Sequence, residues 1–125
     1  MDPRHLKRIK VTQNLFAASF PNVADNLPFE HEKMTKEILD NQSKIDELIS
    51  QYAPKFPIDR IAKIDLAVLR LAIYELIIAP NEPSKVVINE AVELAKEFGG
   101  ERSYAFINAV LGTIFKSLHP EDHEQ

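Results

Sequence analysis

The residues of this chain that most clearly suggest chemistry are basic, and they cluster close to its start. Within the first 20 residues, Arg4, Lys7, Arg8 and Lys10 are balanced only by Asp2, although the whole chain has a net charge of −4 at pH 7. Guanidinium and ammonium groups bind phosphate oxygens, so a basic end on an acidic protein indicates local contact with a polyanion. The simpler alternative is a solvated helix end without a partner.

A second candidate is an aromatic residue near the other end of the chain. If Ile107, Val110 and Leu111 face inward on a helix there, Phe106 lies at the border of the buried stripe. An exposed aromatic ring beside a basic residue is a common platform for a base of single-stranded RNA, and Arg102 lies four residues earlier on the same side. The alternative is that Phe106 belongs to the core.

Signs of catalysis or metal binding are weak. The chain has no cysteine, which excludes disulfides and thiolate zinc sites, and its four histidines lack ligand spacing within the predicted core helices. His119 and His123 are four residues apart, but they lie in a predicted tail where a metal site would lack supporting groups. We find no phosphate-binding glycine loop, HExxH motif or nucleophile elbow. We therefore expect a non-enzymatic protein without a cofactor or a metal.

The elements that position these residues are predicted to be helices, because the chain has three glycines and no convincing alternation of apolar and polar residues. Asp2 and Pro3 form an expected N-cap, and Pro21 stops the first helix. Gly99 and Gly100 are expected to end a helix in the left-handed conformation, and Ser103 to cap the next one. We predict helices over residues 3–20, 28–52 with a break at 41–43, 58–79, 84–98 and 103–118.

The 58–79 segment is predicted to be the central helix, because little of it is polar. The narrow stripe expected to face water consists of Asp59, Lys63, Arg70 and Tyr74. Arg70 is also expected to form a structural ion pair with Glu75 or with another helix. The short connections favour an all-α, compact single-domain helical bundle over residues 1–118, followed by a charged tail over 119–125.

Composition places the protein among ordinary globular domains, with 125 residues and 45% hydrophobic content. Its longest apolar stretch, residues 66–79, contains charged side chains and is too short to span a bilayer. No apolar signal-peptide segment follows the first charges. We expect a cytoplasmic protein without a membrane segment.

Two further residues are candidates for contact with a partner protein. Phe16 lies on the face of the first predicted helix opposite Val11 and Leu15, so one of these faces enters the core and the other stays available. Asp65 lies among apolar residues, where an unpaired carboxylate is costly. Asp65 is therefore either an N-cap after a bend near Lys63, or a rim residue that faces a partner. For Phe16, the alternative is a place in the core.

Three segments, in their order and spacing, resemble the C-terminal core of the NusB family. They are AVLRLAIYEL (67–76), PSKVVINEAVELAKEFG (83–99) and SYAFINAVLGTI (103–114). The stretch RHLKRIKVTQNLF (4–16) is similar to the family's Arg-rich start followed by Gln-x-Leu-Tyr, with Phe16 in the place of the tyrosine. This chain departs from the family pattern in a sparser basic cluster and a shorter segment before Asp59.

The family comprises bacterial transcription-antitermination and ribosomal-RNA biogenesis factors. The resemblance implies a NusB-like bundle that pairs with the NusE-type small-subunit ribosomal protein, holds boxA-like single-stranded RNA and acts on the transcription elongation complex. It implies a protein-partner surface that includes Phe16 and Asp65. The residues that we expect at the RNA, from charge and from the resemblance together, are Arg4, Lys7, Arg8, Lys10, Arg102 and Phe106.

Two other functions remain open at this point. The domain also resembles the RNA-binding module of certain ribosomal-RNA cytosine methyltransferases, and it would then assist such an enzyme in trans. Alternatively, the protein is a structural homodimer that pairs through the second apolar face of its first helix.

Overall fold

The computed structural model describes residues 2–23 and 26–123. Within these ranges the chain forms helices, turns and loops without a strand, which confirms the predicted all-α fold. None of these helices has the length and apolar character needed to cross a bilayer. The α-helices are α1 (Pro3–Ala18), α2 (Lys33–Asp40), α3 (Gln42–Tyr52), α4 (Lys63–Ile73), α5 (Ser84–Phe98) and α6 (Glu101–Leu118). Shorter helical segments are η1 (Ile58–Arg60), η2 (Tyr74–Ile78) and η3 (Pro120–His123).

Helix α1 begins as predicted. The Asp2 side chain accepts a hydrogen bond of 2.8 Å from the backbone N–H of Arg4, and Pro3 occupies the first turn. The helix ends at Ala18, two residues before the predicted end. Its Val11 and Leu15 face is the one that enters the core, and Phe16 on the opposite face is exposed. The alternative of Phe16 as a core residue is therefore wrong.

The second predicted helix starts later than expected but breaks where expected. Residues 28–31 form turns, and the Asn14 side chain holds them by pairing with both the backbone N–H and the carbonyl of Phe29 at 2.8 Å. Asn41 separates α2 from α3 and donates its side-chain N–H to the carbonyl of Glu37 at 2.8 Å. The late start follows from tertiary hydrogen bonds that replace a helical turn.

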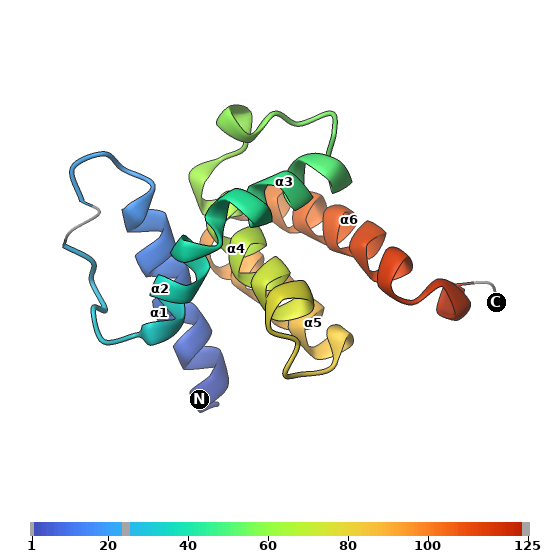
Figure 1. Ribbon diagram of the computed structural model, residues 1–125, viewed down its shortest axis with the longest axis horizontal. Helices are drawn as coiled ribbons and strands as arrows, with labels where there is room; N and C mark the ends of the chain where they lie inside the picture. The colour runs from blue at the N-terminus through green and yellow to red at the C-terminus, as the bar shows by residue number, and fades with distance from the viewer. Residues whose placement is uncertain (1, 24–25, 124–125) are drawn as a thin grey trace.

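Helix α4 is central, as predicted, and packs against α1, α3, α5 and α6 (Figure 1). The predicted water-facing stripe is wrong for Arg70 and Tyr74, because both are buried. The Arg70 guanidinium binds both carboxylate oxygens of Asp46 on α3, at 2.9 and 3.0 Å, which confirms its structural ion pair with another helix. The Tyr74 hydroxyl donates to Glu37 on α2, and this hydrogen bond raises the pKa of Tyr74 to about 12.

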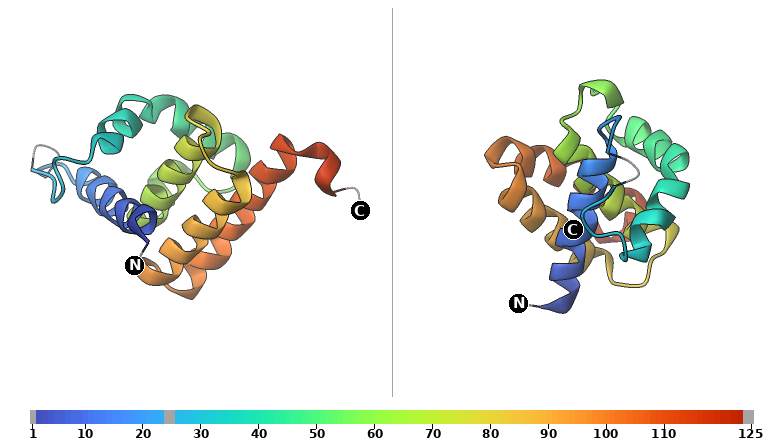
Figure 2. Two further views of the ribbon diagram at one scale, coloured as in Figure 1. Left: turned by 90° about the horizontal axis from the view of Figure 1, so that it is seen from below. Right: turned by 90° about the vertical axis from the view of Figure 1, so that its left-hand side faces the viewer.

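Helices α5 and α6 lie side by side in antiparallel directions, and the far end of α6 extends from the body (Figure 2). Gly100 joins them with φ 86° and ψ −166°, a conformation open to glycine but different from the predicted left-handed helical one. Helix α6 starts at Glu101, so Ser103 is not its cap and is instead buried in the first turn. In the predicted tail, η3 covers residues 120–123, and residues 124–125 lie outside the described ranges.

Candidate nucleic-acid interface

Arg8 points into the protein, so its predicted RNA contact is wrong. It is 5% exposed, and its Nε and Nη2 atoms each lie 2.9 Å from a carboxylate oxygen of Glu75. The same guanidinium also contacts Glu82 and Glu90. Burial acts to lower the pKa of Arg8, but the hydrogen bonds and charges of Glu75 and Glu82 outweigh it and leave that pKa raised. A buried guanidinium whose donors are occupied by three carboxylates is not available to phosphate.

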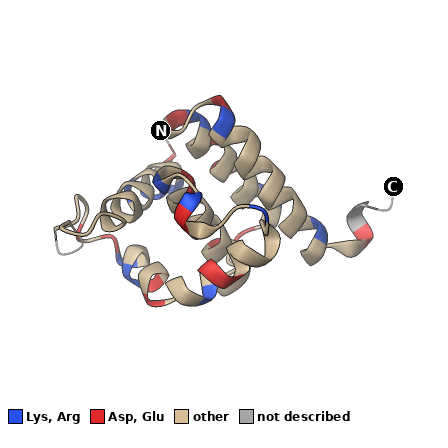
Figure 3. Cartoon of the chain, turned by 90° about the horizontal axis from the view of Figure 1, so that it is seen from above, with Lys and Arg blue, Asp and Glu red and all other residues tan. Residues whose placement is uncertain are grey.

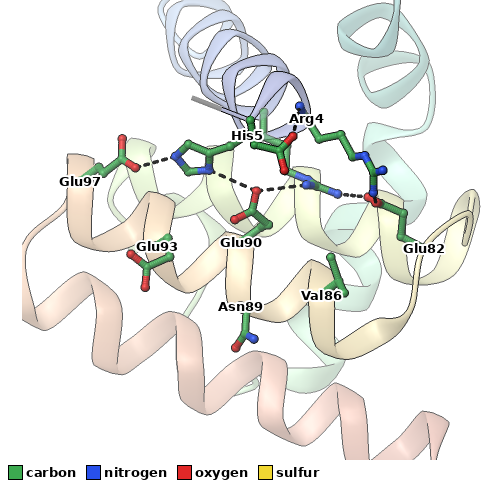
Figure 4. Close-up of a pocket in the computed structure, with 10 residues that line it drawn as sticks. Arg4, His5, Glu82, Val86, Asn89, Glu90, Glu93 and Glu97 are labelled. Carbon is green, nitrogen blue, oxygen red and sulfur yellow. Dashed lines mark hydrogen bonds and ion pairs between the residues drawn. The ribbon is translucent and has the colours of Figure 1, made fainter.

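His5 extends this cluster along α5, as Figure 4 shows. Its Nδ1 lies 3.1 Å from Glu90 and its Nε2 lies 2.7 Å from Glu97. Arg4 completes the cluster through an ion pair of 3.0 Å with Glu82, although the Arg4 side chain is 74% exposed. We call this set the α1–α5 clasp, made of Arg4, His5, Arg8, Glu75, Glu82, Glu90 and Glu97.

The ion pairs of the clasp shift the pKa values of His5 and Glu82. The hydrogen bond to Glu97 raises the pKa of His5 above its usual 6.5, with Glu90 acting in the same direction against burial. Burial acts to raise the pKa of Glu82, but its contacts with Arg8 and Arg4 outweigh this and lower that pKa. Both shifts favour the charged forms, whose ion pairs join α1 to α5 and to the segment before it. Sequence periodicity could not reveal the clasp, because the partners of its α1 residues lie 67 to 92 residues away along the chain.

The other basic residues of α1 reach solvent to different degrees. Lys7 is exposed, and Lys10 is half-buried with its ammonium nitrogen 5.8 Å from the centre of the Phe29 ring. Arg4 keeps most of its surface in water despite its pair with Glu82. Basic and acidic positions are interspersed over the molecule, so a polyanion site needs a local excess of cations (Figure 3).

Such an excess exists in a groove formed by the first half of α6, the loop at 53–62 and the start of α4. The groove has a volume of about 1080 Å³ and is lined by Arg102, Phe106 and Asp65, which the structure therefore brings together. The described residues of α1 do not line it. Phe106 is half-buried, in agreement with its predicted border position.

The groove also contains residues that the sequence analysis missed. Phe56, from the loop, is 50% exposed and packs edge-to-face on Phe106, with ring centres 4.9 Å apart and planes at 65°. Lys55 and Arg60 add two positive charges to that of Arg102. The sequence does contain one sign of an exposed ring here, which is the position of Phe56 between Pro54 and Pro57. Two prolines make a loop rigid, so an apolar ring within it cannot easily turn inward.

The two predicted protein-contact residues lie near the start of α4. Asp65 is the third residue of α4 and makes no capping hydrogen bond, since the cap position is Ala62. Its interpretation as an N-cap is therefore wrong. Phe16 packs edge-to-face on Phe20 with ring centres 5.1 Å apart, and the Lys63 ammonium lies 5.5 Å from the centre of the Phe20 ring.

Metal ligation has no structural counterpart in the part of the chain that the structure describes. These ranges contain no group of three or more His, Asp or Glu side chains placed to hold a metal ion. The His119 Nε2 lies 3.0 Å from the Ser84 hydroxyl oxygen, and the side chain of His123, its predicted partner, lies outside the described part of the chain.

Comparison with known proteins agrees with this architecture. The model of the NusB family matches residues 11–116. The transcription antitermination protein NusB of Bacillus licheniformis is 36% identical over 92% of this chain and 98% of its own length. The corresponding protein of Bacillus subtilis is 38% identical over 89% of this chain and 93% of its own length.

Solved structures show the same fold. A structure of NusB from T. maritima has a TM-score of 0.75 at 36% identity, covering 92% of each chain. A chain in the crystal structure of antitermination factors NusB and NusE in complex with dsRNA has a TM-score of 0.68 at 24% identity, covering 93% of this chain and 99% of that one. The family match, the curated relatives and the shared fold agree, and the chain therefore belongs to the NusB family.

Proposed function

We propose that this protein is a non-enzymatic, RNA-binding adaptor in transcription antitermination and ribosomal RNA synthesis. In this role it pairs with a NusE-type ribosomal protein, and the pair holds boxA-like single-stranded RNA. The relatives named transcription antitermination protein NusB support a role in antitermination. The structure of NusB and NusE in complex with dsRNA supports a NusE-type protein and RNA as the partners. A protein with this role works in the bacterial cytoplasm, on the transcription elongation complex.

The observation that carries the proposal is the groove beside Phe106. Lys55, Arg60 and Arg102 line this groove together with two packed aromatic rings, and Asp65 is the one carboxylate among its described lining residues. Cations at the rim attract phosphates, while an aromatic face stacks on an unpaired base and contributes roughly 1–3 kcal/mol per base. Three phosphate contacts give weak binding on their own, so a second RNA-binding chain is expected.

The protein-contact surface is proposed to lie next to this groove. Phe16 and Phe20 are exposed at the end of α1, and Asp65 lies on the first turn of α4. An exposed aromatic pair beside a carboxylate offers both apolar area and a charge for a basic partner. Because Asp65 also lines the RNA groove, a partner bound here is well placed to contact the same RNA.

The test is formation of the ternary complex. A labelled boxA-like RNA is titrated with this protein alone, with the NusE-type protein alone and with both, and a scrambled RNA of equal length serves as the control. The proposal predicts that the mixture binds the boxA-like RNA more tightly than either protein alone. Equal binding of both RNAs by the mixture, or no gain on mixing, contradicts it.

Self-association is a second candidate, supported by the exposed apolar face of α1. Leu6 and Phe16 of α1 are 42% and 38% exposed, and Phe20, just beyond the end of the helix, packs on Phe16. Light scattering decides between the two uses of this face. A dimeric mass that persists when the NusE-type protein is added favours the homodimer, whereas a shift to a heterodimer favours the adaptor.

A further inference from the structure

Phe56 is held half-exposed by a loop that leaves it little freedom. The residue lies between Pro54 and Pro57, and its backbone N–H donates to the carbonyl of Ala53 at 3.0 Å. A proline restricts the residue before it to extended conformations, and Pro57 is also the N-cap of the short helix η1. Half of the Phe56 surface therefore stays exposed although the loop restricts its position. Such an exposed apolar ring suggests contact with a bound partner.

The angle between the two rings limits what they can hold. Phe56 and Phe106 pack edge-to-face with planes at 65°, so their free faces point in different directions. Two bases that stack on these faces cannot remain stacked on each other. The pair therefore suits two unstacked bases of a single strand and does not suit a continuous helix.

The surroundings of the rings favour a nucleic acid over a protein segment. Small side chains, Ala105, Ala109 and Thr113, line the α6 side of the groove and leave room for flat rings. Lys55, Arg60 and Arg102 give the lining more positive than negative charge. This charge complements a phosphate backbone and repels a basic protein segment.

We propose that Phe56 is a second base-stacking residue, which holds the nucleotide next to the one on Phe106. The inference rests on the proposed function, because it assigns a further contact to the same RNA. It adds a specific arrangement: the strand bends at this step and presents two neighbouring bases to two rings.

The test compares three substitutions of Phe56, each with the NusE-type protein present and with a labelled boxA-like RNA. Phe56→Ala removes the ring, Phe56→Leu keeps an apolar side chain without an aromatic face, and Phe56→Trp keeps a face. We expect the first two to weaken binding by roughly 5- to 150-fold and the third to bind like the parent. The dependence on salt should not change, because no phosphate contact is lost. Phe98→Ala is the matched control, since Phe98 is 36% exposed on α5 and does not line the groove.

A scan of the RNA tests whether the two bases are neighbours. Abasic nucleotides are placed at each position in turn. The parent protein should show two adjacent positions at which loss of the base weakens binding, and Phe56→Ala should be insensitive at one of them. Non-additivity of this kind is expected when a side chain and a base contact each other.

The outcomes separate this inference from the function on which it rests. If Phe106→Ala weakens RNA binding while Phe56→Ala binds like the parent, the second stacking contact is wrong and the adaptor function stands. If Phe56→Leu binds like the parent, the ring acts only as apolar bulk, and stacking is overturned. If Phe56→Ala weakens binding of the NusE-type protein in the absence of RNA, the groove holds protein. If the parent itself does not bind the RNA, the proposed function has failed first.

Discussion

Arg8 on α1 and Glu75 in η2 form a buried ion pair with two hydrogen bonds, both 2.9 Å long. Glu75 belongs to the π-helical segment that follows α4, and it lies 67 residues from Arg8 in sequence. The pair therefore joins the first helix to the centre of the bundle. Loss of Arg8 would leave the Glu75 carboxylate uncompensated in the interior, whereas Arg8 also has Glu82 and Glu90 as partners.

Replacement of Arg8 should affect folding. Arg8→Met keeps the apolar stem but leaves Glu75 without its cation, so the free energy of unfolding should fall by about 3–5 kcal/mol at pH 7. Urea unfolding measures the loss. Arg4→Ala is the control, because its exposed ion pair with Glu82 should contribute at most about 1 kcal/mol. Equal losses for the two variants contradict the buried pair.

His5 should make stability depend on pH. The pKa of His5 is raised in the folded protein by Glu97 and Glu90, so its contribution is fully present below the unfolded pKa of about 6.5. That contribution is lost as the pH rises through the raised value. Arg8 is the permanent cation nearby, and it shares Glu90 with His5.

The measurement compares unfolding free energies over a series of pH values that starts below the unfolded pKa of about 6.5 and rises into the alkaline range, past the raised pKa of His5. The parent should lose stability across this interval, and His5→Gln should lose less. A proton titration of the His5 ring by NMR gives the same pKa independently. The prediction fails if His5→Gln shows the same loss as the parent.

Much of the fold could be predicted because its signals are local. Asp2 and Pro3 mark the start of α1, Asn41 marks the break between α2 and α3, and the spacing of Val87 and Leu94 identifies the buried face of α5. Each signal depends on residues within a turn or two of one another. At these places the sequence is therefore sufficient to predict where a helix begins or breaks and which of its sides is buried.

The errors arise where distant residues decide the outcome. The sequence pattern places Arg8 at the surface, because it does not show that three carboxylates converge on Arg8 from η2, from α5 and from the segment between them. Arg70 and Tyr74 were expected to face water for the same reason, although Asp46 and Glu37 meet them inside. Phe56 was missed because its importance comes from its place beside Phe106.

Gly99 should tolerate no side chain. A Cβ atom built there would lie 2.3 Å from the Ser103 hydroxyl oxygen and 2.4 Å from the Ser103 Cβ. Gly99→Ala should therefore lower the free energy of unfolding by about 1–3 kcal/mol through overpacking. In a Ser103→Gly background the same change should cost less, because both clashing atoms are gone. Identical costs in the two backgrounds, measured by urea unfolding, would show that Ser103 is not the obstacle.

Asp65 should contribute to binding of the partner protein. Asp65→Lys reverses the charge on the first turn of α4, so affinity for a basic NusE-type protein should fall in the absence of RNA. Calorimetry measures the affinity, and circular dichroism checks that helix content is unchanged. Glu47→Lys is the control, because Glu47 is exposed on α3 and outside the groove. Unchanged affinity for Asp65→Lys would remove Asp65 from the interface.

The most direct test of the RNA-adaptor function is a salt-dependent titration of labelled boxA-like RNA, with the NusE-type protein present. Arg102→Ala should weaken binding and reduce the slope of log affinity against log salt by about 0.7, the value for one lost phosphate contact on a single strand. Phe106→Ala should weaken binding by roughly 1–3 kcal/mol with nearly the parent slope, because it removes a stacking face and no charge. If both variants bind like the parent at every salt concentration, the groove does not hold RNA and the function proposed for it is wrong.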